Sequence, residues 1–109
     1  MPQYFPGDVV LAFLRLGNGN ESKVRPAIVI ENKDAGYVIL CPVTSKMPED
    51  NTFVSLVLDD FEKGGLSIFD ESYILLSENF KIRNSEILGK KGQLTKEKIL
   101  SLKTAVNRH

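Results

Sequence analysis

The chain has 109 residues, 42% of them hydrophobic, and its 14 basic residues balance its 14 acidic ones. This length can enclose one hydrophobic core and not two, so we expect a single domain spanning residues 1–109. No run approaches the roughly 18 apolar residues of a membrane helix, and residues 1–6 lack a signal-peptide pattern, so we expect a cytoplasmic protein. A single cysteine, Cys41, excludes an intramolecular disulfide and a cysteine metal cluster.

The charges are unevenly distributed. Residues 79–109 hold eight bases and two acids, a balance of 8 − 2 = +6, so residues 1–78 carry −6. A basic final third can form a surface for phosphates, because neutralising them releases counterions. A solvated helix face that carries lysines explains the same pattern equally well.

Short apolar and β-branched runs, bounded by glycine, proline and asparagine, predict strands over residues 9–14, 24–30, 37–43, 53–58, 72–76 and 89–94. The turn-forming segment 32–36 joins the second and third runs into the clearest hairpin. We interpret Asp59-Asp60 and Asp70-Glu71 as solvated turns, and Lys63-Gly64-Gly65 as another turn.

The end of the chain changes its period. Ile99, Leu102 and Val106 fall on one helical face after Thr95, a favourable N-cap residue, and the Leu94 and Ile99 spacing is that of a hydrophobic staple. Several short strands around one core, with a terminal helix packed on them, predict a mostly β fold of the small, partly closed SH3-like barrel kind.

The hairpin predicts a candidate site at its open end. In an antiparallel pair the facing residue numbers have a constant sum, here about 68 if the turn is centred near Asp34, which sets Arg25 opposite Val43. Thr44 is then the diagonal neighbour or the direct partner of Arg25, within reach for both to hold one group. The planar guanidinium suits phosphate oxygens, and the hydroxyls of Thr44 and Ser45 can donate to another oxygen.

Simpler interpretations stay open at this point. Arg25 is also explained as a solvated cation paired with Glu21 or Glu31, and hydroxyls after a strand commonly cap the next turn, above all at Ser45. The sequence offers few groups for other hydrolytic mechanisms. The only histidine, His109, is the last residue, so a nucleophile has no dependable base. The adjacent acids would point to opposite faces of a strand, so they are poor metal ligands. We expect no metal and no cofactor.

Three segments carry a family resemblance: Gly7-Asp8-Val9-Val10, then Val24-Arg25-Pro26-Ala27-Ile28-Val29, then Leu40-Cys41-Pro42-Val43-Thr44-Ser45. In order and spacing they resemble the MazF/PemK toxins of bacterial type II toxin-antitoxin systems. The resemblance implies an SH3-like barrel that forms a homodimer, cuts single-stranded RNA at short sequences without a metal, and is silenced by a small antitoxin protein. It also implies that Arg25 and Thr44 are catalytic.

Ser45, Glu21 and Lys46 are the candidate substrate-binding residues beside this pair. Two departures from the family pattern concern the RNA sequence that is recognised. Glu21 stands one position closer to the Arg-Pro than a Glu-Gln pair of the family, and Ser77-Glu78-Asn79 replaces an Asp-Gln.

Two functions of different classes follow. The first is an mRNA interferase, an endoribonuclease in which the 2′-hydroxyl of the RNA attacks the adjacent phosphate and leaves a 2′,3′-cyclic phosphate. The second is a non-catalytic SH3-like module that binds nucleic acid or a partner protein.

Overall fold

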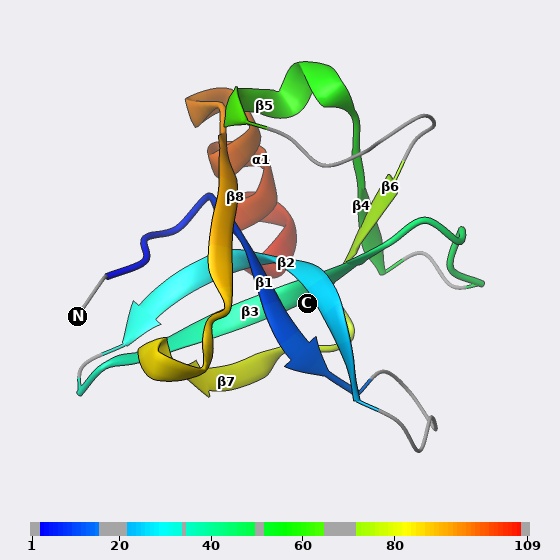
Figure 1. Ribbon diagram of the computed structural model, residues 1–109. Helices are drawn as coiled ribbons and strands as arrows, with labels where there is room; N and C mark the ends of the chain where they lie inside the picture. The colour runs from blue at the N-terminus through cyan, green and yellow to red at the C-terminus, as the bar shows by residue number, and fades with distance from the viewer. Residues whose placement is uncertain (1–2, 16–21, 34, 50–51, 65–71, 108–109) are drawn as a thin grey trace.

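The computed structural model describes residues 3–15, 22–33, 35–49, 52–64 and 72–107. It is mostly β with one C-terminal helix, as expected, and has short 3-10 turns at Leu58–Asp60 and Asn84–Glu86. The elements shown in Figure 1 are β1 (Asp8–Leu14), β2 (Lys23–Lys33), β3 (Tyr37–Thr44), β4 (Phe53–Leu56), β5 (Phe61–Gly64), β6 (Ser72–Leu75), β7 (Phe80–Arg83), β8 (Gly89–Leu94) and α1 (Lys96–Asn107).

Each of the six predicted runs contains a strand, whereas β5 and β7 were not predicted. The turn expected at Lys63-Gly64 is wrong, because both residues belong to β5 and pair with β8. β5 lies at one end of the strand order and is mostly exposed, so its sequence carries no alternating apolar signal. Gly65 and Asp70-Glu71 lie outside the described residues.

Asp60 is not simply a solvated turn residue. Its carboxylate accepts a hydrogen bond from the Val57 backbone nitrogen at 2.9 Å and forms an ion pair with Lys98 of α1 at 3.3 Å. The contact is long-range in sequence, so spacing alone does not reveal it. Asp60 therefore helps to fix the helix to the segment before β5.

The strands form one antiparallel sheet with the order β4-β6-β3-β2-β1-β8-β5, and β7 pairs with β3 outside this path. The barrel is open, since β4 and β5 are the two ends of the sheet among the described residues. Long-range pairing also brings the beginning of the chain beside its last third, since β1 pairs with β8.

Two apolar clusters lie on opposite faces of the central strands. Val10, Val29 and Leu40 belong to the first cluster, and their neighbours Val9 and Cys41 belong to the second. Strand alternation explains the division, because successive side chains point to opposite faces. α1 covers the second cluster, on the side of the sheet where β5 and β8 lie beside it (Figure 1).

The predicted helix start is confirmed. The Thr95 hydroxyl accepts a hydrogen bond from the Lys98 backbone nitrogen at 3.2 Å, and Leu94 and Ile99 belong to the same cluster. Gly7, with φ of 95°, lets the chain pass close to the helix, because a Cβ there would collide with Ile99 Cδ1. Within the described residues, no helix has the length and apolar character needed to cross a membrane.

Candidate active site

The β2–β3 hairpin sets the positions of Arg25 and Thr44. Ala27 pairs with Pro42, a residue sum of 69, and the sum rises to 70 nearer the turn because a bulge lies between Val29 and Glu31. The expected sum of 68 is therefore wrong by one. The turn is centred near residue 35 and not 34, which gives a sum of 70 beside it, and the bulge then lowers the sum to 69. The observed pairs end at Ala27 and Pro42. Extending their sum by two residues predicts Thr44, and not Val43, as the residue that faces Arg25.

Strand alternation predicts that the two side chains share one face of the sheet. Arg25 follows the face of Ala27, Thr44 follows the face of Pro42, and Ala27 and Pro42 are direct partners. Beyond this pair β2 continues along β1, with Arg25 opposite Ala12, and β3 continues along β6, with Thr44 opposite Tyr73. The site thus lies where β2 and β3 turn to different neighbours.

Arg25 is half-buried near the start of β2. Its Nε–H donates a hydrogen bond to the Leu14 carbonyl oxygen at 3.3 Å, on the last residue of β1. A guanidinium has five N–H donors, so this contact at Nε holds the group in position and uses only one of them. The other donors are suited to two oxygens of one phosphate.

Thr44 is also half-buried, and its hydroxyl oxygen accepts a hydrogen bond from the Lys46 backbone nitrogen at 3.2 Å. This is the turn-capping bond that we considered for Ser45, made instead by Thr44. It uses a lone pair of the oxygen and not the hydroxyl hydrogen. The side chains of Ser45 and Lys46 are exposed beside Thr44, and Glu21 lies outside the described residues.

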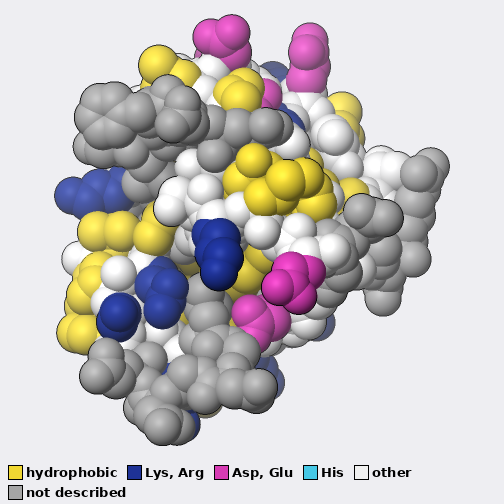
Figure 2. Space-filling model, turned by 90° about the vertical axis from the view of Figure 1, so that its right-hand side faces the viewer, with side chains coloured by type: hydrophobic (Ala, Val, Ile, Leu, Met, Phe, Trp, Pro, Cys, Tyr) yellow, Lys and Arg dark blue, Asp and Glu magenta, His cyan; other side chains and the backbone are white. Residues whose placement is uncertain are grey.

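The surface on this side of the molecule combines basic and apolar side chains. Figure 2 looks onto the side where β4 and β6 lie in Figure 1, and shows Lys and Arg side chains beside a hydrophobic patch, with Asp and Glu side chains next to both. Phosphates and base rings favour these two kinds of surface, respectively. The basic and apolar parts of this side therefore suit a single-stranded nucleic acid, whereas the adjacent acids oppose its phosphates.

Cys41 and the acidic residues do not form an alternative reactive site among the described residues. Cys41 is buried, and burial raises the pKa of its thiol to about 11, which disfavours the nucleophilic thiolate. In the part of the chain that the structure describes, no three His, Cys, Asp or Glu side chains gather closely enough to hold a metal ion. Arg25 and Thr44 remain the candidates with phosphate chemistry.

A second polar cluster, which the sequence did not reveal, lies at the other end of β3. The Lys81 ammonium lies 4.8 Å from the centre of the Tyr37 ring and the Arg83 guanidinium carbon lies 5.9 Å from it. Arg83 Nε also donates a hydrogen bond to the Tyr37 hydroxyl at 3.2 Å, and this bond raises the pKa of Arg83. The alternation of Phe80 and Ile82 with two bases was the signal for this strand.

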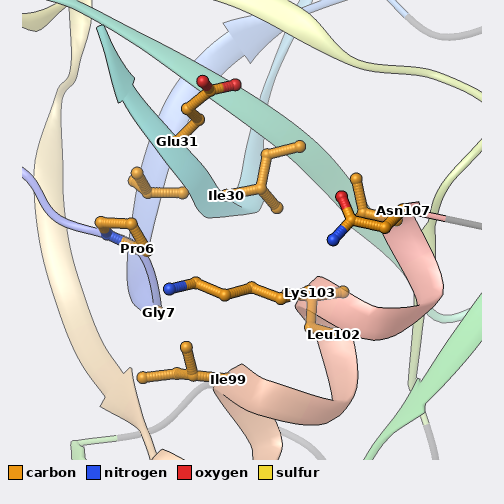
Figure 3. Close-up of a pocket in the computed structure, with 10 residues that line it drawn as sticks. Pro6, Gly7, Ile30, Glu31, Ile99, Leu102, Lys103 and Asn107 are labelled. Carbon is orange, nitrogen blue, oxygen red and sulfur yellow. The ribbon is translucent and has the colours of Figure 1, made fainter.

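A hollow of about 250 Å³ lies beneath α1, apart from the Arg25 and Thr44 pair and from the Tyr37 cluster. Its walls include Ile30 from β2 and Ile99, Leu102 and Val106 from α1. Figure 3 shows the Lys103 side chain extending across it toward Pro6 and Gly7. None of the predicted site residues lines this hollow, so it is not part of the candidate active site.

The family model of PemK-like, MazF-like toxins of type II toxin-antitoxin systems matches residues 5–109. No curated protein matches the chain in sequence. The match covers nearly all of the chain, including both strands of the hairpin and the terminal helix.

Solved structures show the same fold. The Mycobacterium tuberculosis toxin MazF-mt6 is 17% identical, with a TM-score of 0.68 and 93% of each chain covered. An endoribonuclease from a mycobacterial species in complex with its cognate antitoxin is also 17% identical, with a TM-score of 0.65 over 96% of this chain and 92% of its own. A further mycobacterial endoribonuclease is 16% identical, with a TM-score of 0.68 over 99% of this chain and 91% of its own.

Proposed function

Because this chain belongs to the PemK-like, MazF-like toxins of type II toxin-antitoxin systems, we propose that it is a cytoplasmic, metal-independent endoribonuclease that cuts single-stranded mRNA at short sequences. The observation that carries the proposal is the pairing of Ala27 with Pro42. Extending this register predicts Arg25 and Thr44 on one face of neighbouring strands. An arginine and a hydroxyl in this relation suit one phosphodiester group.

The proposed reaction needs no water and no metal in its bond-breaking step. The 2′-oxygen of the RNA forms a bond to the adjacent phosphorus, and the bond from phosphorus to the 5′-oxygen breaks. The 2′-hydroxyl loses a proton and the 5′-oxygen gains one, so the products are a 2′,3′-cyclic phosphate and a 5′-hydroxyl. Between them the phosphorus carries an additional negative charge on its oxygens.

Each residue of the pair has one assigned role. Arg25 stabilises the charge that develops on the phosphorane oxygens, and its bond to the Leu14 carbonyl fixes the guanidinium before the substrate arrives. Thr44 donates its hydroxyl hydrogen to the same oxygens. We assign Arg25 to charge stabilisation because a guanidinium hardly deprotonates and is a poor base.

The proposed partners are a small antitoxin protein and a second copy of the chain. A mycobacterial endoribonuclease of the same fold was solved in complex with its cognate antitoxin, which supports the first. Phe13 and Val24 support the second, because they lie opposite each other on β1 and β2 with exposed fractions of 59% and 48%. A paired apolar surface of this kind is typical of contacts between proteins.

The test is cleavage of a long unstructured RNA in EDTA by the wild-type protein and by Arg25→Ala and Thr44→Val. We expect the wild type to leave 2′,3′-cyclic phosphate ends and both variants to be strongly impaired. Undiminished cleavage by both variants, or cleavage only with added metal, contradicts the proposed site. Binding of the RNA without any cleavage favours the non-catalytic module.

A further inference from the structure

The structure separates the bases of the final third into two kinds. Lys90 forms an ion pair with the buried carboxylate of Asp8 at 3.1 Å, and Lys98 forms one with Asp60 at 3.3 Å. These two lysines join elements of the fold. They are therefore not free to serve a phosphate, although the sequence alone counts them in the basic excess.

Lys81 and Arg83 differ from these lysines. Both are exposed, and neither forms an ion pair with a described residue. They alternate with Phe80 and Ile82, whose side chains pack on the first apolar cluster, so the two cations project from the other face of β7. There β7 pairs with β3, and Tyr37 lies directly opposite Arg83.

Tyr37 holds the two cations in place. Its ring attracts the Lys81 ammonium, and its hydroxyl accepts a hydrogen bond from Arg83 Nε. This leaves the terminal nitrogens of the guanidinium available as donors for oxygens of an anion. Two cations fixed by an aromatic side chain lose little freedom when an anion binds.

The charges around the cluster set the size of the effect. On the same sheet surface Lys33 is paired with Glu31 at 2.9 Å, and Glu86 accepts a hydrogen bond from the Arg83 backbone nitrogen. Lys33, Lys81 and Arg83 are positive and Glu31 and Glu86 are negative, so the net charge of these five side chains is 3 − 2 = +1. Such a surface favours a flexible polyanion over a neutral partner, with a modest contribution to affinity.

From these contacts we propose that Tyr37, Lys81 and Arg83 form a second RNA contact, which binds backbone phosphates of nucleotides that flank the cleaved bond. The inference rests on the proposed function, because it takes single-stranded RNA as the ligand. Tyr37 and Thr44 are the first and last residues of β3, and seven steps of about 3.3 Å separate them by roughly 23 Å. Seven is an odd number of steps, so the Tyr37 and Thr44 side chains leave opposite faces of β3. Only an RNA that extends beyond the cleaved bond and passes around the sheet can reach both ends.

The test measures binding of 2′-O-methyl RNA, which lacks the attacking hydroxyl and cannot be cleaved. Oligomers of about 5 and about 20 nucleotides bracket the lengths that small single-strand binding domains cover. We expect the double variant Lys81→Ala/Arg83→Ala to bind the longer oligomer roughly tenfold more weakly and the shorter one about equally. The slope of log affinity against log salt should fall by about 1.4 for the longer oligomer, as two lost phosphate contacts require.

The matched control is Lys91→Ala/Lys96→Ala, which removes two exposed lysines elsewhere on the surface and changes the net charge by the same amount. An equal loss of affinity in the control, or an unchanged affinity in the Lys81/Arg83 variant, overturns the inference. Poly-glutamate is the second probe. If it binds as tightly as the oligomer and loses affinity equally in the variant, the surface is a contact for acidic proteins and the RNA assignment is wrong.

The measurement is independent of catalysis. A wild type that binds the long oligomer through this cluster and cleaves no RNA keeps the inference and refutes the proposed reaction. A wild type that cleaves RNA while the variant binds normally does the opposite. Circular dichroism melting of each variant shows that it is folded, and Lys81→Gln/Arg83→Gln is the second version if the alanines unfold it.

Discussion

The two ends of β3 hold their polar side chains in different ways. At the Thr44 end, backbone groups fix the side chains: the Leu14 carbonyl binds Arg25, and the Lys46 nitrogen binds the Thr44 hydroxyl. At the Tyr37 end, side chains fix each other through a ring and a hydroxyl. Backbone anchors are less mobile, so the first end suits a reaction that demands accurate geometry and the second suits a tolerant contact.

The largest effect is expected at Arg25. Arg25→Ala removes the donor of charge stabilisation, which is commonly worth about 3 to 4 kcal/mol, so the cleavage rate should fall at least a hundredfold. Single-turnover kinetics on a fluorescent RNA measure it. Arg25→Lys should recover little of the rate, because a point charge replaces the planar fork.

The exposed Lys91→Ala is the control for lost charge in this experiment. A fall of similar size in that variant would mean that net charge and not position matters. Full activity of Arg25→Ala would remove the backbone-anchored end from the reaction altogether.

The buried thiol of Cys41, in the middle of β3, predicts that stability depends on pH. Burial raises the Cys41 pKa from 9.0 to about 11. The unfolded chain therefore loses this proton first, so the contribution is complete below pH 9 and is lost as the pH rises toward 11. The free energy of unfolding should fall by about 1.4 kcal/mol per pH unit in this window. Urea unfolding of the wild type and of Cys41→Val measures it.

Cys41→Val cannot ionise at this position, so its stability should fall less steeply over the same pH range. Equal slopes for the two proteins would contradict the prediction. Since Cys41 is the only cysteine, a thiol reagent should also react with the native chain far more slowly than with the unfolded one.

Thr44 tests the same end with a smaller change. Thr44→Val keeps the shape and removes the hydroxyl, and loss of a hydrogen bond to a charged group costs roughly 1.5 to 3 kcal/mol. Cleavage should therefore slow by about ten- to a hundredfold. Thr44→Ser should restore most of the rate, and Thr104→Val, on an exposed part of α1, is the matched control.

The smallest effect is expected at Tyr37. Tyr37→Phe keeps the ring and removes the hydroxyl that holds Arg83, so affinity for the oligomer of about 20 nucleotides should fall only about twofold. Tyr37→Leu removes the ring as well and should approach the loss of the double variant. If Tyr37→Leu binds as the wild type does, the cations act alone and the ring is not an organising group.

The sequence predicted the parts of the fold that local patterns determine. Six strands, the hairpin turn and the Thr95 cap follow from periodicity and from residues within a few positions of each other. β5 was not predicted, because it lies at an end of the sheet and its own charged residues are exposed. β7 has an alternating pattern but only four residues, too few for the pattern to predict a strand.

The candidate sites divide along the same line. Arg25 and Thr44 could be set close together because one short turn joins their strands. The register was wrong by one residue, because the turn is centred one residue later than expected and the bulge offsets only part of that shift. The contact between Tyr37 and Arg83 spans 46 positions. No local rule pairs such distant residues, because their meeting depends on which strands become neighbours in the sheet.

The bulge between Val29 and Glu31 has a consequence for comparison among relatives. It sets two residues of β2 against one of β3. Ile30 is the additional residue, and Glu31 still pairs with Ile39, the residue of β3 next to the partner of Val29. A homologue that lacks one residue here can keep the same pairing on both sides of the irregularity. A single-residue gap at this point of an alignment is therefore compatible with an unchanged arrangement of Arg25 and Thr44.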